Sequence, residues 1–107
     1  DIAAAVSIAA QHTANPGPQD FKALGRILGY LLYTVDYRLR LGGNKSTQLT
    51  IFTDSDWAGD QEDRKSQSGY VAQFGQSTVS WSSRKQKSVS RSSMEAEYIA
   101  MADGLAE

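Results

Sequence analysis

The spacing of apolar residues changes once along this sequence, and the change limits the folds open to it. Between Gln19 and Tyr33, apolar side chains recur at helical spacing and form one stripe. From Tyr37 onward they alternate with polar side chains, which is typical of strands. We therefore expect an α+β chain with a boundary between Val35 and Thr47.

The same two periods predict the individual elements. Helices are expected at residues 1–13 and 19–33, and a last helix is expected to start near Ser92 and to run to the end of the chain. Strands are expected at residues 37–41 and 48–53, and a hairpin at residues 69–75 and 77–82. The polar stretch 55–68 predicts a loop, and the stretch 82–93 predicts a basic, serine-rich connector.

Composition excludes several kinds of site. The 107 residues include no cysteine, which excludes a disulfide scaffold, a thiolate zinc site and a cysteine nucleophile. The net charge of -1 gives no general attraction to nucleic acid, so any such binding must come from a local patch. No stretch has the pattern of a signal peptide or the length of a membrane span, and we expect no membrane association.

One acidic residue follows an apolar run. Asp54 comes just after Leu49-Thr50-Ile51-Phe52. A carboxylate at the end of a buried strand is held rigidly, as a two-metal nuclease needs for ions about 4 Å apart. Its hard oxygen ligands suit Mg²⁺ or Mn²⁺. The alternative is that Asp54 only opens a turn, since Asp is common at strand ends.

The last predicted helix offers two glutamates with different expected roles. Ser92-Ser93-Met94-Glu95 matches a capping box, in which the glutamate side chain reaches back to the first amide of the helix. That gives Glu95 a structural role. Glu97 is rotated by roughly 200° about the helix axis, so it faces elsewhere and has no capping role.

Four blocks of the sequence, in order, resemble the ribonuclease H region of copia-type retrotransposon Pol polyproteins. They are residues 51–60 (IFTDSDWAGD), 64–71 (RKSQSGYV), 80–86 (SWSSRKQ) and 92–100 (SSMEAEYIA). Upstream, residues 1–31 resemble the end of the reverse transcriptase and its connection. The resemblance covers nearly the whole chain, and four motifs in the family's order are far more specific than any one of them.

The resemblance implies a domain division, a fold and a reaction. Residues 1–40 would be the helical end of the reverse transcriptase, and residues 41–107 the N-terminal part of a truncated ribonuclease H-like domain. In the complete domain, acidic residues hold two Mg²⁺ or Mn²⁺ ions and cut the RNA strand of an RNA–DNA hybrid. The first two ligands would be Asp54 and Glu97. The remaining acids are expected beyond Glu107, so weak or absent activity is expected of this chain alone.

The resemblance also implies partners and a location. The partners would be the hybrid and the remainder of the Pol polyprotein, inside the cell, either in a cytoplasmic virus-like particle or in the nucleus. The sequence departs from the family at Met94, where threonine is usual, and at Gly25 and Gly29, where basic residues are usual. None of these departures touches the expected metal ligands.

A basic segment and a lone histidine complete the candidates. The segment contains four cations and no acid, with Trp81 nearby for base stacking: Arg84, Lys85, Lys87 and Arg91. It is either a contact to the phosphates of the hybrid or a solvated connector. His12 has no cysteine or second histidine beside it, and we expect an ordinary surface residue.

Three functions remain open from the sequence. The chain is a fragment of a ribonuclease H enzyme, a catalytically dead remnant that binds nucleic acid or protein, or a helical adaptor dominated by residues 1–34. Ancestry favours the first.

Overall fold

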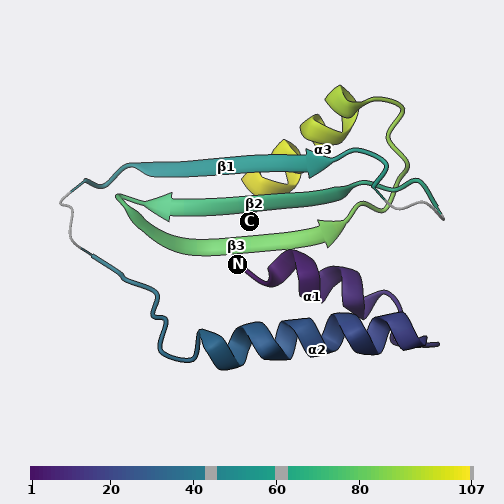
Figure 1. Ribbon diagram of the computed structural model, residues 1–107. Helices are drawn as coiled ribbons and strands as arrows, with labels where there is room; N and C mark the ends of the chain where they lie inside the picture. Colours follow the sequence, from purple (N-terminus) through teal and green to yellow (C-terminus); the bar gives the residue numbers. More distant parts are fainter. Residues whose placement is uncertain (43–45, 60–62, 107) are drawn as a thin grey trace. The chain divides into compact units, whose positions relative to one another are not determined.

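The computed structural model describes residues 1–42, 46–59 and 63–106, which contain helices and an antiparallel sheet (Figure 1). The elements in chain order are α1 (Ala3–Ala10), α2 (Pro18–Tyr33), β1 (Leu49–Asp56), β2 (Gln67–Phe74), β3 (Ser77–Lys85) and α3 (Ser93–Leu105). The expected mixture of helices and antiparallel strands is confirmed. The chain divides into two units, Asp1–Leu39 and Arg40–Glu107.

The first unit is a pair of helices whose junction is fixed by one carboxylate. Asp20, in the first turn of α2, accepts a hydrogen bond from the Gly17 amide at 2.6 Å and pairs with His12 Nδ1 at 2.7 Å. His12 is exposed, as expected, but it has this structural partner. Neither helix contains a buried residue, so the apolar stripe of α2 remains largely open to solvent.

Two predicted elements of this region are corrected. The first helix ends at Ala10, because the amides of Gln11, His12 and Thr13 bond to carbonyls three residues back and form turns instead. The strand predicted at residues 37–41 does not form. Arg38 instead donates to the carbonyls of Val35 and Tyr37, and none of the strands in the described parts of the chain pairs with this stretch.

The second unit is a three-stranded antiparallel sheet in the order β1-β2-β3. The predicted hairpin is confirmed as β2 and β3, joined at Gly75, whose φ of 64° is the left-handed conformation that glycine adopts freely. β1 extends to Asp56, three residues further than predicted, because it pairs with β2 along its whole length. β3 likewise extends to Lys85, so part of the predicted connector is strand.

One face of the sheet is covered by α3 (Figure 1). The residues of α3 that are buried recur every four positions and are all small: Ala96, Ala100 and Gly104. Small side chains let the helix backbone come close to the strands. The helix ends at Leu105 rather than running to the end of the chain, because the Ala106 amide is shared between the carbonyls of Ala102 and Asp103.

The core of this unit is unusually polar. Among the described residues, the buried hydrophobic side chains are Tyr70, Ala72, Ala96 and Ala100. The buried polar side chains are Ser66, Ser68, Ser77, Gln86 and Ser90. Hydrogen bonds must therefore contribute much of the specificity with which this unit packs.

The contact at Gly104 yields the first prediction. A Cβ added there would lie 2.8 Å from Thr53 Cγ2 and 3.3 Å from Tyr70 Cβ. Gly104→Ala gains about 1 kcal/mol of helix propensity, but overpacking against a stiff β-branched side chain costs about 1–3 kcal/mol. We expect the melting temperature to fall by several degrees in thermal denaturation.

Gly29→Ala is the matched control. Gly29 also lies inside a helix, but a Cβ there meets nothing within 4 Å. This change should leave stability unchanged or raise it. A Gly104→Ala protein as stable as the native chain would show that α3 does not pack this closely.

The junction of the helix pair yields a second prediction. The hydrogen bond from the Gly17 amide, followed by that from His12, lowers the pKa of Asp20 below its ordinary value of 3.8. Its contribution to stability is therefore fully present above the unfolded pKa and is lost as the pH falls through the lowered folded pKa. Asp20→Asn should reduce helicity at about pH 6, and circular dichroism should show the difference shrinking as the pH falls below the ordinary Asp pKa and through the lowered folded pKa of Asp20.

Candidate functional site

Asp54 projects from the face of the sheet that α3 does not cover. Side chains alternate along a strand, and the methyl groups of Ile51 and Thr53 lie on the α3 side, against Gly104. Asp54 therefore points the other way, opposite Gly69 of β2. Its Oδ1 accepts a hydrogen bond from the Ser55 amide at 2.9 Å, and the side chain is exposed. It sits within a paired strand rather than at a turn, so its backbone is held on one side by β2.

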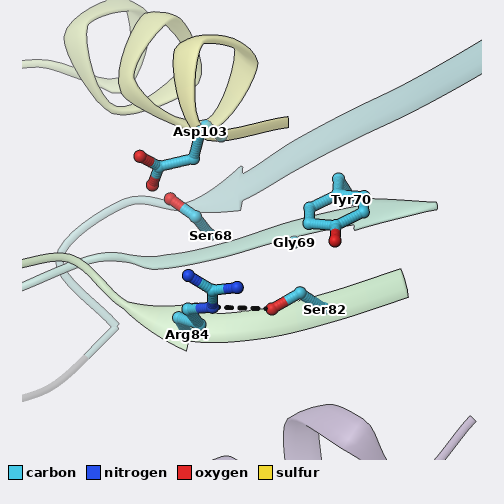
Figure 2. A pocket seen from close by; sticks show the side chains of 7 residues that line it. Ser68, Gly69, Tyr70, Ser82, Arg84 and Asp103 are labelled. Atoms are coloured by element: carbon cyan, nitrogen blue, oxygen red, sulfur yellow. Dashed lines mark hydrogen bonds between the residues drawn. The ribbon is translucent and has the colours of Figure 1, made fainter. Parts of the chain in front are cut away.

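Glu97 lies on the flank of α3 that faces β1. With about 100° between successive residues, Glu97 and Asp103 fall on opposite sides of the buried stripe. Asp103 lines a small cavity of about 20 Å³ with Ser82 and Arg84, so its flank faces β2 and β3 (Figure 2). Glu97 is exposed on the other flank, toward the outer edge of β1.

The two predicted ligands thus share the β1 side of the sheet but project from opposite layers. A shared ion would have to sit at the outer edge of β1, where no strand pairs among the described residues. Across residues 1–42, 46–59 and 63–106, no group of three or more acidic or histidine side chains is placed to hold a metal ion. Asp60 and Glu62 of the acidic loop lie outside the described residues.

The four predicted phosphate contacts are distributed rather than gathered. Arg84 pairs with Ser68 of β2 and lies on the α3 side, where its Nε donates to Ser82 Oγ. Lys85 faces the other way and lies 3.0 Å from Asp63, which also approaches Lys65 at 3.8 Å. Lys87 and Arg91 are exposed in the connector between β3 and α3.

An apolar row crosses the uncovered face of the sheet. Phe52, Val71 and Trp81 are direct neighbours in the strand register and are 57%, 37% and 48% exposed. Trp81 is thus exposed, and its role in base stacking stays a prediction. Asp54 lies on the same face, two residues after Phe52 in β1, and is therefore next to this row.

The chain is 41% identical over its whole length to secreted RxLR effector protein 161 of Plasmopara viticola, and it spans 75% of that protein. It is 40% and 41% identical, again over its whole length, to the retrovirus-related Pol polyproteins from transposons RE2 and RE1 of Arabidopsis thaliana. The chain belongs to one family with these proteins. It matches no protein-family model and no solved structure.

The homology to Pol polyproteins confirms the resemblance at the level of the family. The chain spans only 7% of each Arabidopsis polyprotein, so the activities of the whole polyprotein are not thereby established for it. None of the described helices is long and apolar enough to cross a lipid bilayer.

Sequence reasoning missed the best-connected group of this family member. Gln86 Nε2 donates to Ser68 Oγ at 2.8 Å and to the Ala96 carbonyl at 2.9 Å, and its Oε1 accepts from Ser90 Oγ at 2.8 Å. Its own amide donates to the Ser66 carbonyl. We call Gln86 and these four partners the Gln86 network. The available signal was the pair of serines at alternate positions, Ser66 just before β2 and Ser68 within it, where the buried face of a strand should be apolar.

The Gln86 network also reaches the loop that follows β1. Trp57 Nε1 donates to the Ser90 carbonyl at 3.2 Å, and the Ala58 amide donates to Ser66 Oγ at 3.1 Å. The first bond ties the loop after β1 to the connector that leads into α3, and the second ties it to the residue before β2. Residues of all four family-like blocks therefore meet in one set of hydrogen bonds.

The start of α3 shows how the two glutamates divide. Ser92 Oγ accepts from the Glu95 amide at 3.2 Å, as predicted. The Glu95 carboxylate accepts from the Arg91 amide at 2.6 Å, one residue before the helix cap rather than at the cap itself. Glu95 therefore has the expected structural role at the start of α3, but its partner is the Arg91 amide instead of the Ser92 amide.

This cap yields a third prediction. Ser92→Ala removes the acceptor for the Glu95 amide and should cost about 1 kcal/mol of unfolding free energy. Ser93→Ala, at the next position, is the control and should be nearly neutral, because alanine favours helix. Urea denaturation monitored by circular dichroism measures both. Equal stability losses in the two variants would argue against the cap.

Proposed function

We propose that this chain is the first part of a ribonuclease H-like domain, and that Asp54 and Glu97 are two of its metal ligands. In the complete domain they would help hold two Mg²⁺ or Mn²⁺ ions for hydrolysis of the RNA strand of an RNA–DNA hybrid. The observation that carries the proposal is the placement of both carboxylates on the β1 side of the sheet, one from the strand and one from the helix. Homology to Pol polyproteins supports the same reading.

The chemistry of the two side chains fits such ions. Both are exposed carboxylates, the oxygen ligands that Mg²⁺ and Mn²⁺ prefer. Each is attached to a backbone held by hydrogen bonds, Asp54 through pairing with β2 and Glu97 through α3. Two carboxylates leave two ions short of protein ligands, so further acids from the rest of a Pol polyprotein complete the site in this proposal.

The hybrid is proposed to contact the exposed cations Lys87 and Arg91 together with Arg84. Lys85 is a weaker contributor, because Asp63 already lies 3.0 Å from it. The proposed location is intracellular, in a virus-like particle or the nucleus, as for a working Pol product.

A second function is a binding module without chemistry. It is favoured by the row of exposed apolar side chains, Phe52, Val71 and Trp81, on the face of the sheet that α3 does not cover. One relative, of which the chain covers 75%, is named a secreted effector rather than a polyprotein.

The proposal predicts that the chain alone does not cut. Incubation of the 107-residue chain with a labelled RNA–DNA hybrid and Mg²⁺ or Mn²⁺ should give no cleavage, because its ions would keep too many waters. Mn²⁺ should nevertheless broaden the amide signals of Asp54 and Glu97 in nuclear magnetic resonance spectra, and Asp54→Asn should reduce the broadening. Absence of any Mn²⁺ effect at these two residues would favour the binding module.

The two glutamates are then separated in a chain extended with the downstream Pol sequence. Glu97→Gln should abolish cleavage with little change in melting temperature, because it removes a ligand charge but keeps the side-chain shape. Glu95→Gln is the matched control and should cleave almost normally, since a Gln oxygen can still accept from the Arg91 amide. Loss of activity in Glu95→Gln alone would reverse the assignment.

A further inference from the structure

Gln86 holds α3 at a point directly beside the proposed ligand. Its Nε2 donates to the carbonyl of Ala96, the residue before Glu97. The same nitrogen donates to Ser68 on β2, so one amide group bridges the sheet and the helix. The residue is 4% exposed, and water cannot readily replace these bonds.

The orientation of this amide is determined by its partners. Ser90 Oγ donates to Oε1, so Nε2 is turned toward the two acceptors. The Gln86 backbone is fixed at the end of β3, because its amide donates to the Ser66 carbonyl at 2.8 Å. The Gln86 side chain is therefore held at its backbone and at its amide oxygen, independently of its contact with α3.

The close contact of α3 with the sheet at Gly104 lies seven residues along the helix from Glu97. Near Glu97, the buried side chain is Ala96, whose single methyl group interlocks with the strands less than a large side chain would. A rotation about the helix axis would carry Glu97 away from the β1 side. The hydrogen bond at Ala96 is the directional contact closest to that ligand.

We propose that Gln86 is the positioning residue of the metal site: it sets the rotation of α3 and thereby the place of Glu97. This inference rests on the proposed function for its use of Glu97. It assigns Gln86 no contact with metal or substrate.

The test replaces the donor while keeping the shape. In Gln86→Glu, the carboxylate still accepts from Ser90 but turns an acceptor toward the Ala96 carbonyl. A protonated carboxyl regains one donor and restores that bond. Burial and the facing carbonyl raise the folded pKa of this new carboxyl above about 4.3, so its stability is present at low pH and lost as the pH rises through the folded pKa.

At about pH 7, Gln86→Glu should melt roughly 10 °C below the native chain, and the amide signals of Glu97 and Ala100 should shift. At about pH 4, where the new carboxyl is protonated, both differences should shrink. Gln86→Met, which has no donor, should show the loss at both pH values. Gln76→Glu, in the exposed turn between β2 and β3, makes the same chemical change and should have no effect.

Ser90→Ala guards against a variant that fails to fold, because it removes only the bond that orients the amide. It should move the Glu97 signal less than Gln86→Glu does. A fall in melting temperature without pH rescue, or with the Glu97 signal unmoved in every folded variant, would overturn the positioning role.

Mn²⁺ separates this inference from the proposed function. In the native chain, Mn²⁺ should broaden the signals of Asp54 and Glu97, and in Gln86→Glu at about pH 7 the effect should persist at Asp54 but weaken at Glu97. Equal broadening at Glu97 in both proteins would overturn the positioning role. No broadening in the native chain would instead refute the metal site. In that case, recovery of the α3 amide signals of Gln86→Glu at low pH would still decide whether Gln86 sets the rotation of α3.

Discussion

A single buried amide joins the parts of the larger unit. Gln86 connects β2 through Ser68, the connector through Ser90 and α3 through Ala96. An unsatisfied buried donor or acceptor costs about 1–3 kcal/mol, which is a large fraction of the stability of a small unit. The helix α3 therefore docks where all these bonds can be made. The small residues on its buried side, Ala96, Ala100 and Gly104, allow it to come that close to the sheet.

The sequence predicted the elements that depend on local patterns. Helical spacing in α2, alternation in the hairpin and the serine at the start of α3 each act over a few residues, and each is found in the structure. The predicted strand at residues 37–41 failed because alternation alone does not supply a neighbouring strand. Strand pairing is a long-range property, and the same property extended β1 past its predicted end.

In the candidate site too, the sequence predicted local features but not those that depend on long-range structure. The sequence singled out Asp54 and Glu97 as predicted metal ligands and assigned Glu95 a structural role at the start of α3. It could not show that these two side chains, Asp54 and Glu97, project from opposite layers, since that follows from strand register and from the rotation of α3. It also missed the network of Gln86, because a glutamine within a basic, serine-rich stretch has no local pattern that distinguishes a buried residue from an exposed one.

The polar interior of the larger unit has a consequence for how its stability varies with temperature. Exposing apolar surface on unfolding raises the heat capacity, whereas exposing polar surface lowers it. In this unit, three buried serines are hydrogen-bonded to Gln86: Ser66, Ser68 and Ser90. On unfolding, the unit therefore exposes less apolar surface than a unit with an ordinary apolar core. Its free energy of unfolding should therefore follow a flatter curve with temperature, with little weakening on cooling.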